Sequence, residues 1–95
     1  MKQPAIYILA NRSNSVLYIG VTGNLKQGVW LHKAGEIEGF TKKYNVHKLV
    51  YFEVFEDFRA AIDREKQLKK WNRSWKEALI SELNPSRSDL YYELL

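Results

Sequence analysis

The sequence predicts a small α/β protein of the α+β kind, in which a three-stranded antiparallel sheet is flanked by three helices in the order β-β-α-β-α-α. Three short runs of β-branched and aromatic residues indicate the strands, and three helical patterns carry recognisable start signals. The chain has 95 residues, of which 45% are hydrophobic and 14% aromatic. That length and composition suit one core, so we expect a single domain over residues 1–95.

The first two strands are expected to form a hairpin. Residues 5–10 (Ala-Ile-Tyr-Ile-Leu-Ala) and 16–21 (Val-Leu-Tyr-Ile-Gly-Val) are short apolar runs, and residues 11–15 between them have the composition of a turn. Two such runs joined by a short polar link are typical of antiparallel pairing. Residues 48–54, with Leu-Val-Tyr-Phe at their centre, predict the third strand.

The first helix is expected after residue 24. Asn24 followed by Gln27 resembles a capping box, in which the side chain at the start of a helix accepts a backbone hydrogen bond. Leu25, Val29 and His32 then share one helical face. We therefore expect this face to pack against the sheet.

The second and third helices have their own signals. Asp57 can cap a helix that runs to about Trp71. Residues 74–77, Ser-Trp-Lys-Glu, form a capping-box pattern for the last helix. Asn84-Pro85 ends it, because the residue before a proline avoids helical backbone angles.

Composition excludes several kinds of site. The chain has no cysteine, so it has no disulfide, no thiolate metal site and no cysteine nucleophile. The absence of cysteine fits a reducing compartment such as the cytoplasm. Two histidines, His32 and His47, cannot build a multi-histidine metal centre. No apolar run approaches the ~18 residues of a membrane span, and residues 1–4 lead into only a short apolar stretch. We expect neither a membrane segment nor a signal peptide.

The distribution of charge favours a basic face. Fifteen lysines and arginines against eleven acidic residues give a net charge of +4. The basic residues in the middle and later parts of the chain include Lys42, Lys43, Lys48, Arg64, Lys66, Lys69, Lys70, Arg73 and Lys76. This pattern is compatible with a polyanionic partner, although ordinary solvated surfaces carry similar charge.

Glu65 is the residue that departs most from the helical pattern. At about 100° per residue, the apolar residues of the second helix fall on one broad face: Phe58, Ala61, Ile62, Leu68 and Trp71. Glu65 lies inside that arc, where a carboxylate is unfavourable unless it is paired, hydrogen-bonded or bound to a metal. It is therefore either a rim residue paired with an arginine or a ligand for a divalent metal.

Two strand tyrosines and a strand glycine form a second group. Tyr7 and Tyr18 lie in strands that should be neighbours, where a tyrosine commonly packs against the sheet. Gly20 weakens its strand, and a strand glycine often marks the close approach of a ligand or another backbone. His32 lies on the inward edge of the first helix, either as a structural histidine or as part of a site.

Gly28 is unexpected inside a helix. A glycine there destabilises the helix by about 1 kcal/mol relative to alanine, and nothing in the local pattern offsets this. It lies one turn before His32, so both positions project toward the same place. Either a neighbour approaches this turn closely or a longer side chain has been lost here.

Together these residues resemble the GIY-YIG endonuclease family, in particular the small stand-alone bacterial members, and more distantly the nuclease domains of excision-repair incision proteins and homing endonucleases. The resemblance covers nearly the whole chain. The residues that carry it are, in order, the degenerate motif Ala5-Ile6-Tyr7, the intact motif Tyr18-Ile19-Gly20, His32 at the family's spacing, Glu65 within residues 64–71 (Arg-Glu-Lys-Gln-Leu-Lys-Lys-Trp), and Asn84-Pro85.

The resemblance implies hydrolysis of DNA phosphodiester bonds with one divalent ion, Mg²⁺ or Mn²⁺. Tyr7 and Tyr18 would orient or deprotonate the attacking water. Because a tyrosine with its ordinary pKa of about 10 is a poor base at neutral pH, it would need help from the metal, from neighbouring cations or from a proton relay through His32. Glu65 would hold the metal ion on the leaving-group side. The positions expected to bind substrate or support the site are Gly20, Lys42, Lys43, Tyr44 and Asn84.

One departure from the family pattern concerns a catalytic position. The family has an arginine eight residues after the glycine of its second motif, where it binds the scissile phosphate, and this chain has Gly28. Loss of such a donor typically lowers the rate 10²–10³-fold, and loss of an arginine finger in phosphoryl transfer 10³–10⁵-fold. Lys26 is a weak substitute because it points elsewhere on the helix.

Three hypotheses follow. The chain is a metal-dependent DNA endonuclease, acting in DNA repair as a monomer on branched, gapped or single-stranded junction DNA and selecting structure rather than sequence. Alternatively, it is a nucleic-acid-binding module of the same fold with impaired catalysis, which accounts for Gly28 but not for Glu65. As a third alternative, it is an interaction domain that uses exposed aromatics such as Trp30 and Trp75.

Overall fold

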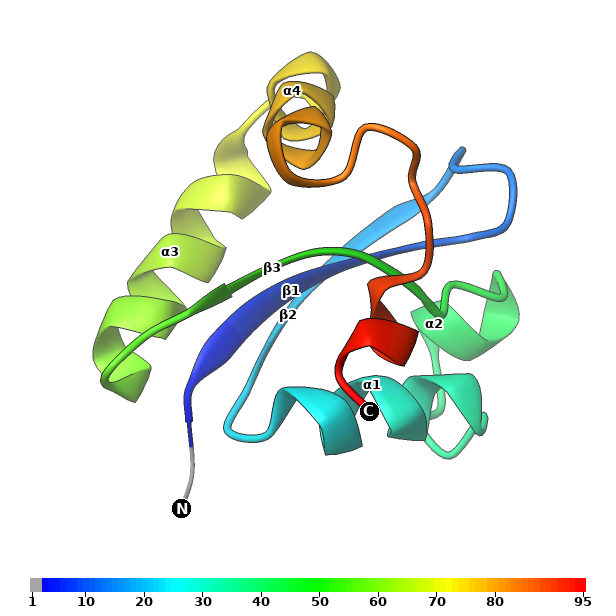
Figure 1. Ribbon diagram of the computed structural model, residues 1–95, viewed down its shortest axis with the longest axis horizontal. Coiled ribbons are helices and arrows are strands. Elements are labelled where there is room, and N and C mark those ends of the chain that lie inside the picture. The colour runs from blue at the N-terminus through cyan, green and yellow to red at the C-terminus, as the bar shows by residue number, and fades with distance from the viewer. Residues whose placement is uncertain (1–2) are drawn as a thin grey trace.

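A three-stranded antiparallel sheet forms the centre of the molecule (Figure 1). The computed structural model describes residues 3–95; Met1 and Lys2, at the start of the expected domain, lie outside the described residues. The strands are β1 (Ala5–Ala10), β2 (Leu17–Thr22) and β3 (Lys48–Val54), in the spatial order β2-β1-β3. The central strand β1 pairs with both neighbours and is buried along its whole length.

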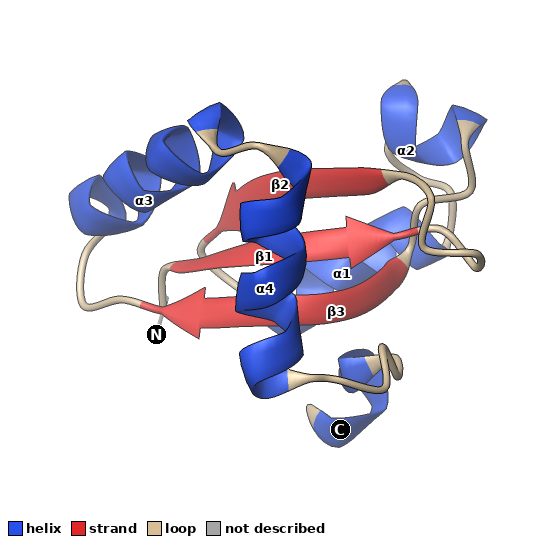
Figure 2. Ribbon diagram, turned by 90° about the horizontal axis from the view of Figure 1, so that it is seen from above, coloured by secondary structure: helices blue, strands red, loops and turns tan. Residues whose placement is uncertain are grey.

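Helices cover both faces of this sheet. The helical elements are α1 (Leu25–Lys33), α2 (Phe40–Lys43), α3 (Phe58–Lys70), α4 (Arg73–Leu83) and the 3₁₀ helix η1 (Leu90–Glu93). Figure 1 shows α3 and α4 on one side and α1 with η1 on the other, and in Figure 2 α4 crosses over the strands. Within residues 3–95, no helix combines the length and hydrophobicity needed to cross a bilayer.

The alternation of side chains along β1 divides the core in two. Ile6 and Ile8 pack toward α3 and α4, together with Leu68 and Ile80. Tyr7 and Leu9 point the other way, into a second cluster that includes Val29 of α1. Because strand side chains alternate between faces, neighbouring residues of one strand serve two separate layers. Tyr7 therefore lies on the α1 side.

The predicted fold class and order of elements are confirmed. The strands over 5–10 and 48–54 have the expected bounds, and β2 begins and ends one residue later than expected. Asn24 and Asp57 cap α1 and α3 as predicted, through the backbone N–H groups of Gln27 and Ala60. The structure adds two short elements, α2 and η1, that the sequence pattern did not indicate.

Two details of the helices differ from the prediction. The cap of α4 is Asn72 rather than Ser74: the Asn72 side chain accepts from Trp75 N, and Ser74 Oγ donates to Asn72 Oδ1. The capping residue therefore lies two positions earlier. Phe58 and Ile62 of α3 are exposed rather than buried, because the buried stripe of the helix is centred on Ala61 and Leu68 and these two residues lie at its rim.

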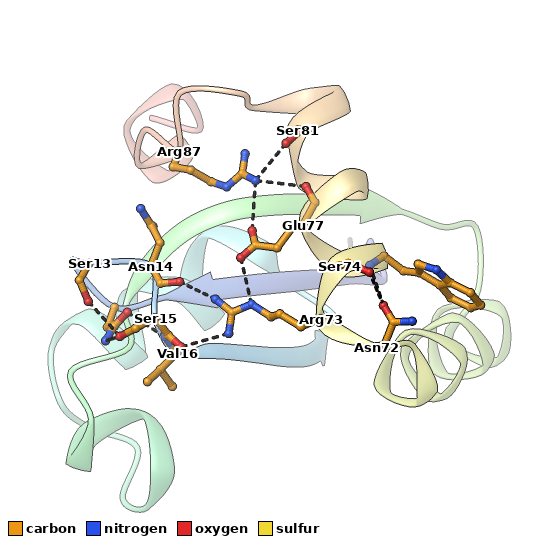
Figure 3. A network of polar contacts seen from close by, with 12 residues as sticks. Ser13, Asn14, Ser15, Val16, Asn72, Arg73, Ser74, Glu77, Ser81 and Arg87 are labelled. Carbon is orange, nitrogen blue, oxygen red and sulfur yellow. Dashed lines mark hydrogen bonds and ion pairs between the residues drawn. The ribbon is translucent and has the colours of Figure 1, made fainter.

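An arginine network holds the β1–β2 turn against α4 (Figure 3). Arg73 donates to the backbone oxygens of Asn14 and Ser15 and pairs with Glu77, Nε to Oε2 at 2.9 Å. Arg87 binds the other oxygen of Glu77 at 3.1 Å. These contacts use two of the chain's arginines for structure.

The Tyr7 ring packs across Gly20, its direct partner in the β1–β2 register. A Cβ atom at position 20 would lie 2.4 Å from Tyr7 Cζ and 2.5 Å from Tyr7 Oη. Real carbon atoms do not approach this closely, so any side chain at position 20 would displace the ring. Gly20 is thus the close-approach glycine that its position in a strand suggested.

We expect Gly20→Ala to destabilise the protein by about 1–3 kcal/mol, the usual range for overpacking a core. In a Tyr7→Leu background the same change should be less destabilising, because leucine has no atoms where the end of the ring lies. Urea unfolding of the four proteins gives the coupling free energy. Equal destabilisation in both backgrounds would show that the Tyr7–Gly20 contact does not limit position 20.

Candidate active site

Three side chains from β1, β2 and α1 meet on the α1 side of the sheet. Tyr7 Oη lies 3.0 Å from His32 Nε2, within hydrogen-bond distance. The Tyr18 ring is 6.4 Å from the Tyr7 ring and 5.5 Å from the His32 ring, measured between centroids. The structure thus brings together residues separated by up to 25 positions in sequence.

His32 is held from its other side by Thr41 of α2. His32 Nδ1 and Thr41 Oγ1 are 2.8 Å apart, and both residues are buried. Burial is the main cause that lowers the pKa of His32 below its ordinary value of 6.5, and repulsion by His47 adds to it. The imidazole is therefore neutral at pH 7, with one ring nitrogen donating and the other accepting.

The environment of Tyr7 keeps its phenol protonated. Burial raises the pKa of Tyr7 well above its ordinary value, and the negative charges of ionised Tyr18 and of Glu65 raise it further. A free phenolate at this position is therefore strongly disfavoured. Any loss of the Tyr7 proton needs an acceptor in contact with the hydroxyl, and His32 Nε2 is in that position.

Glu65 belongs to α3, which packs against β1 and β2, and its negative charge acts on Tyr7. Its side chain is 16% exposed, and its ion-pair partner is Lys69 Nζ at 3.4 Å. That distance exceeds the usual limit of about 3.2 Å for a good hydrogen bond. The neighbouring Arg64 pairs instead with Glu53 of β3 at 3.0 Å. The arginine-paired alternative for Glu65 is therefore not what the structure shows.

The donor set at Glu65 fits a hard divalent cation. Within residues 3–95, no group of three or more histidine, cysteine or acidic side chains is arranged to hold a metal. A single carboxylate suits Mg²⁺, which keeps several waters and completes its shell with substrate phosphate oxygens. The weakly paired Glu65 carboxylate would suit such an ion, whereas a zinc site would need more protein donors.

Gly28 lies beside the cluster, above β2. A Cβ atom at position 28 would meet the Thr22 side chain, at 3.0 Å from Oγ1 and 3.3 Å from Cβ. Thr22 follows Gly20 by two residues and therefore lies on the same face of β2. Its hydroxyl donates to Asn24 O and accepts from Asn24 N, so the side chain is fixed at the start of α1. The close approach expected at Gly28 comes from Thr22.

The basic residues of the α2 region lie next to the tyrosines. Lys42, Lys43 and Tyr44 line a hollow of about 700 Å³ together with Phe40. Phe40 stacks on Tyr18 at 6.3 Å and contacts Tyr44 at 5.0 Å, between ring centroids. The exposed ion pair of Lys42 with Glu38 raises the pKa of that lysine. Aromatic contacts thus connect this hollow to the cluster.

Asn84 lies elsewhere. It is buried at the end of α4, where its amide nitrogen donates to Val50 O of β3 and to Ser88 O. Its side-chain oxygen accepts from Ser88 N and Ser88 Oγ. These partners belong to β3 and the segment after α4, and the structure does not bring Asn84 to the tyrosine–histidine cluster.

Two residues near the site, Phe40 and Thr41, escaped the sequence analysis, and Lys69 was noted there only as one of the basic residues. Phe40 and Thr41 belong to α2, which is four residues long and too short to show helical periodicity. Lys69 carries an i,i+4 signal with Glu65, which could have identified it as the partner.

Known proteins resemble this chain over most of its length. Residues 3–78 match the model of the GIY-YIG catalytic domain. The UPF0213 protein CPE1444 of Clostridium perfringens is 42% identical over 80% of this chain and 81% of its own length. The UPF0213 protein HQ_3675A of Haloquadratum walsbyi is 36% identical over 74% of this chain and 79% of its own length.

A solved structure shares the fold. The solution NMR structure of the UPF0213 protein BH0048 from Bacillus halodurans has a TM-score of 0.58, with 24% identity and 92% coverage of both chains. The domain match covers far more than half of the sequence, and its two tyrosine motifs lie on the paired strands β1 and β2. The chain belongs to the GIY-YIG family, whose catalytic domain implies an endonuclease acting on DNA.

Proposed function

We propose that this protein is a metal-dependent DNA endonuclease that selects DNA structure rather than sequence, and that Gly28 lowers its rate. The observation that carries the proposal is the buried chain of contacts from Tyr7 Oη through His32 to Thr41, with Tyr18 beside it. Sites that activate a nucleophile are built in the same way: a proton acceptor, here His32, contacts the reactive hydroxyl, here that of Tyr7, and a third group, here Thr41, orients the acceptor.

The proton path runs through Tyr7 and His32. As an attacking water gives its proton to Tyr7 Oη, Tyr7 passes its own proton to His32 Nε2, and His32 Nδ1–H remains bonded to Thr41. The transfers must be coupled, since the raised pKa of Tyr7 disfavours a free phenolate. Tyr18, more exposed than Tyr7, would orient the water.

The scissile phosphate needs positive charge on its leaving side. Bound Mg²⁺ or Mn²⁺ would stabilise the charge that develops on the leaving oxygen. Glu65 would hold that ion on the side of the site opposite α1, and Lys42, Lys43 and Tyr44 would contact the flanking backbone. Gly20 supports the site by admitting the Tyr7 ring. Asn84 remains a proposed supporting residue, acting at a distance through β3.

A second function, a nucleic-acid-binding module with impaired catalysis, is favoured by the surroundings of Gly28. The Thr22 side chain lies close to where a Cβ atom would project, and Lys69 is the ion-pair partner of the carboxylate that would hold the metal. Both features fit a site that no longer needs an arginine or a bound ion. DNA binding without metal-dependent cleavage would identify this function.

The Glu65→Gln variant should lose cleavage supported by Mg²⁺ or Mn²⁺ yet remain folded, because the carboxylate has only a long contact with Lys69. Gel assays on duplex, flap and junction DNA measure cleavage, with EDTA removing the metal. Glu56→Gln, an exposed carboxylate after β3, is the matched control and should cleave like the parent chain. Undiminished cleavage by Glu65→Gln would remove Glu65 from metal binding.

Restoring an arginine should raise the single-turnover rate 10²-fold or more, since a guanidinium one turn before His32 can bind two phosphate oxygens. Gly28→Ala is the matched control: it adds the Cβ contact with Thr22 and the helix propensity without the charge. Because Thr22 must shift by a few tenths of an ångström, we expect little net stabilisation in either variant. A folded Gly28→Arg protein that binds DNA but cuts no substrate would favour the binding module.

Cleavage should also depend on the charge of His32, which accepts a proton only as the neutral imidazole. Because burial lowers its pKa below the ordinary 6.5, the rate should fall as His32 becomes protonated, and this decline should lie at lower pH than for an ordinary histidine. His47→Gln removes a repelling charge and should move this decline toward higher pH. Single-turnover rates in the Gly28→Arg background provide the profile. A decline that is the same in both proteins would exclude His32 as its source.

A further inference from the structure

Four basic side chains from three segments of the chain surround a hollow of about 600 Å³, apart from the tyrosine–histidine cluster. It lies at the end of the sheet where β1 ends and β3 begins, Ala10 being paired with Lys48. The side chains that line it include Arg12, Lys33, His47, Lys48, Asp89 and Tyr92. We call this hollow the basic pocket.

The one acidic side chain among these six is already satisfied. Asp89 Oδ1 accepts from Leu49 N and Tyr91 N, both at 3.1 Å, and Oδ2 pairs with Lys33. Lys33 and Asp89 therefore neutralise each other. The net positive charge of the basic pocket is left on Arg12 and Lys48.

Neither of those two side chains is paired with a carboxylate within residues 3–95. The titration of His47 agrees with a positive local field: burial lowers its pKa, the Lys33 charge lowers it further, and Asp89 opposes the shift. Two unpaired cations beside a histidine provide hydrogen-bond donors for a phosphate group.

The rim of the basic pocket adds an aromatic surface. Tyr92 is 65% exposed and packs edge-on against Tyr91, with ring centroids 5.4 Å apart. Lys33 Nζ lies 5.3 Å from the centroids of both rings, which fixes their arrangement. An exposed aromatic ring next to cations is the combination on which nucleic-acid bases stack in single-strand-binding proteins.

We propose that the basic pocket binds one unpaired nucleotide of the DNA substrate, with its phosphate between Arg12 and Lys48 and its base on Tyr92. A base within a duplex has no free face to offer Tyr92, so this site selects an unpaired strand end, a flap or a gap. The inference rests on the proposed nuclease function and specifies its substrate. His32 and Lys33 are consecutive in α1, so the end of this helix lies between the two sites.

The first test measures binding of fluorescein-labelled flap DNA and blunt duplex in EDTA, which prevents cleavage. Tyr92→Ala should weaken flap binding roughly five-fold or more and leave duplex binding unchanged. Arg12→Gln and Lys48→Gln should each lower the salt slope for the flap by about 0.7. Arg59→Gln, an exposed arginine that follows the opposite end of β3, is the matched control for charge. Equal effects on flap and duplex, or effects no larger than that of Arg59→Gln, would overturn the proposal.

The second test does not depend on nuclease activity. Titration with deoxythymidine 5′-monophosphate, followed by ¹H–¹⁵N NMR, should shift the signals of Arg12, Lys48 and Tyr92 in the wild-type chain, and Arg12→Gln should weaken this binding. Thymidine alone should shift mainly Tyr92. If the signals of Arg12, Lys48 and Tyr92 do not change on addition of the nucleotide, the proposed binding to the basic pocket is wrong, whatever the result of the cleavage assays. If nucleotide and flap binding hold but no DNA is cut, the nuclease proposal fails and the pocket stands.

Discussion

The contact between the Tyr7 ring and Gly20 is the constraint on which the arrangement of the site depends. Tyr7 lies on the central strand, and its ring reaches the α1 layer by crossing β2 where β2 has no side chain. Any other residue at position 20 would block this path. The contact determines where the Tyr7 hydroxyl lies and therefore what surrounds it. The hydroxyl is within hydrogen-bond distance of His32 in α1, the Tyr18 ring of β2 is beside the Tyr7 ring, and the negative charge of Glu65 in α3 acts on it.

The same placement determines the chemistry available to Tyr7. The ring crosses the sheet in a buried position, and burial is the main reason that its pKa is raised. A tyrosine with a raised pKa is a poor base by itself, yet it conducts a proton well when a neutral acceptor touches its oxygen. Burial also keeps His32 neutral, and Thr41 fixes the orientation of the imidazole. Removal from water thus keeps both members of the proposed relay uncharged: it raises the pKa of Tyr7 and lowers the pKa of His32.

Local patterns in the sequence predicted the strands, the caps of α1 and α3 and the order of elements, because hydrophobic periodicity and capping are short-range effects. They also singled out Gly20, Gly28, His32 and Glu65 as residues whose type conflicts with their position. Local patterns could not predict Thr41, since α2 is a single turn with no periodicity of its own. The place of Asn84 against β3 was likewise out of reach, because it depends on how distant elements pack. The pairing of Glu65 with Lys69, by contrast, is a local i,i+4 contact within α3.

The proposed function separates substrate binding from catalysis. Different residues line the α2 hollow and the basic pocket, and position 28 contributes to neither. The glycine there would remove a charge that acts on the transition state, whereas Arg12, Lys43 and Lys48 would contact a DNA backbone already in the ground state. Electrostatic attraction to the backbone depends on the number of phosphates neutralised, and a single missing guanidinium changes that number little. The chain can therefore retain its affinity for DNA while its rate depends on whether the metal and the remaining donors compensate for Gly28.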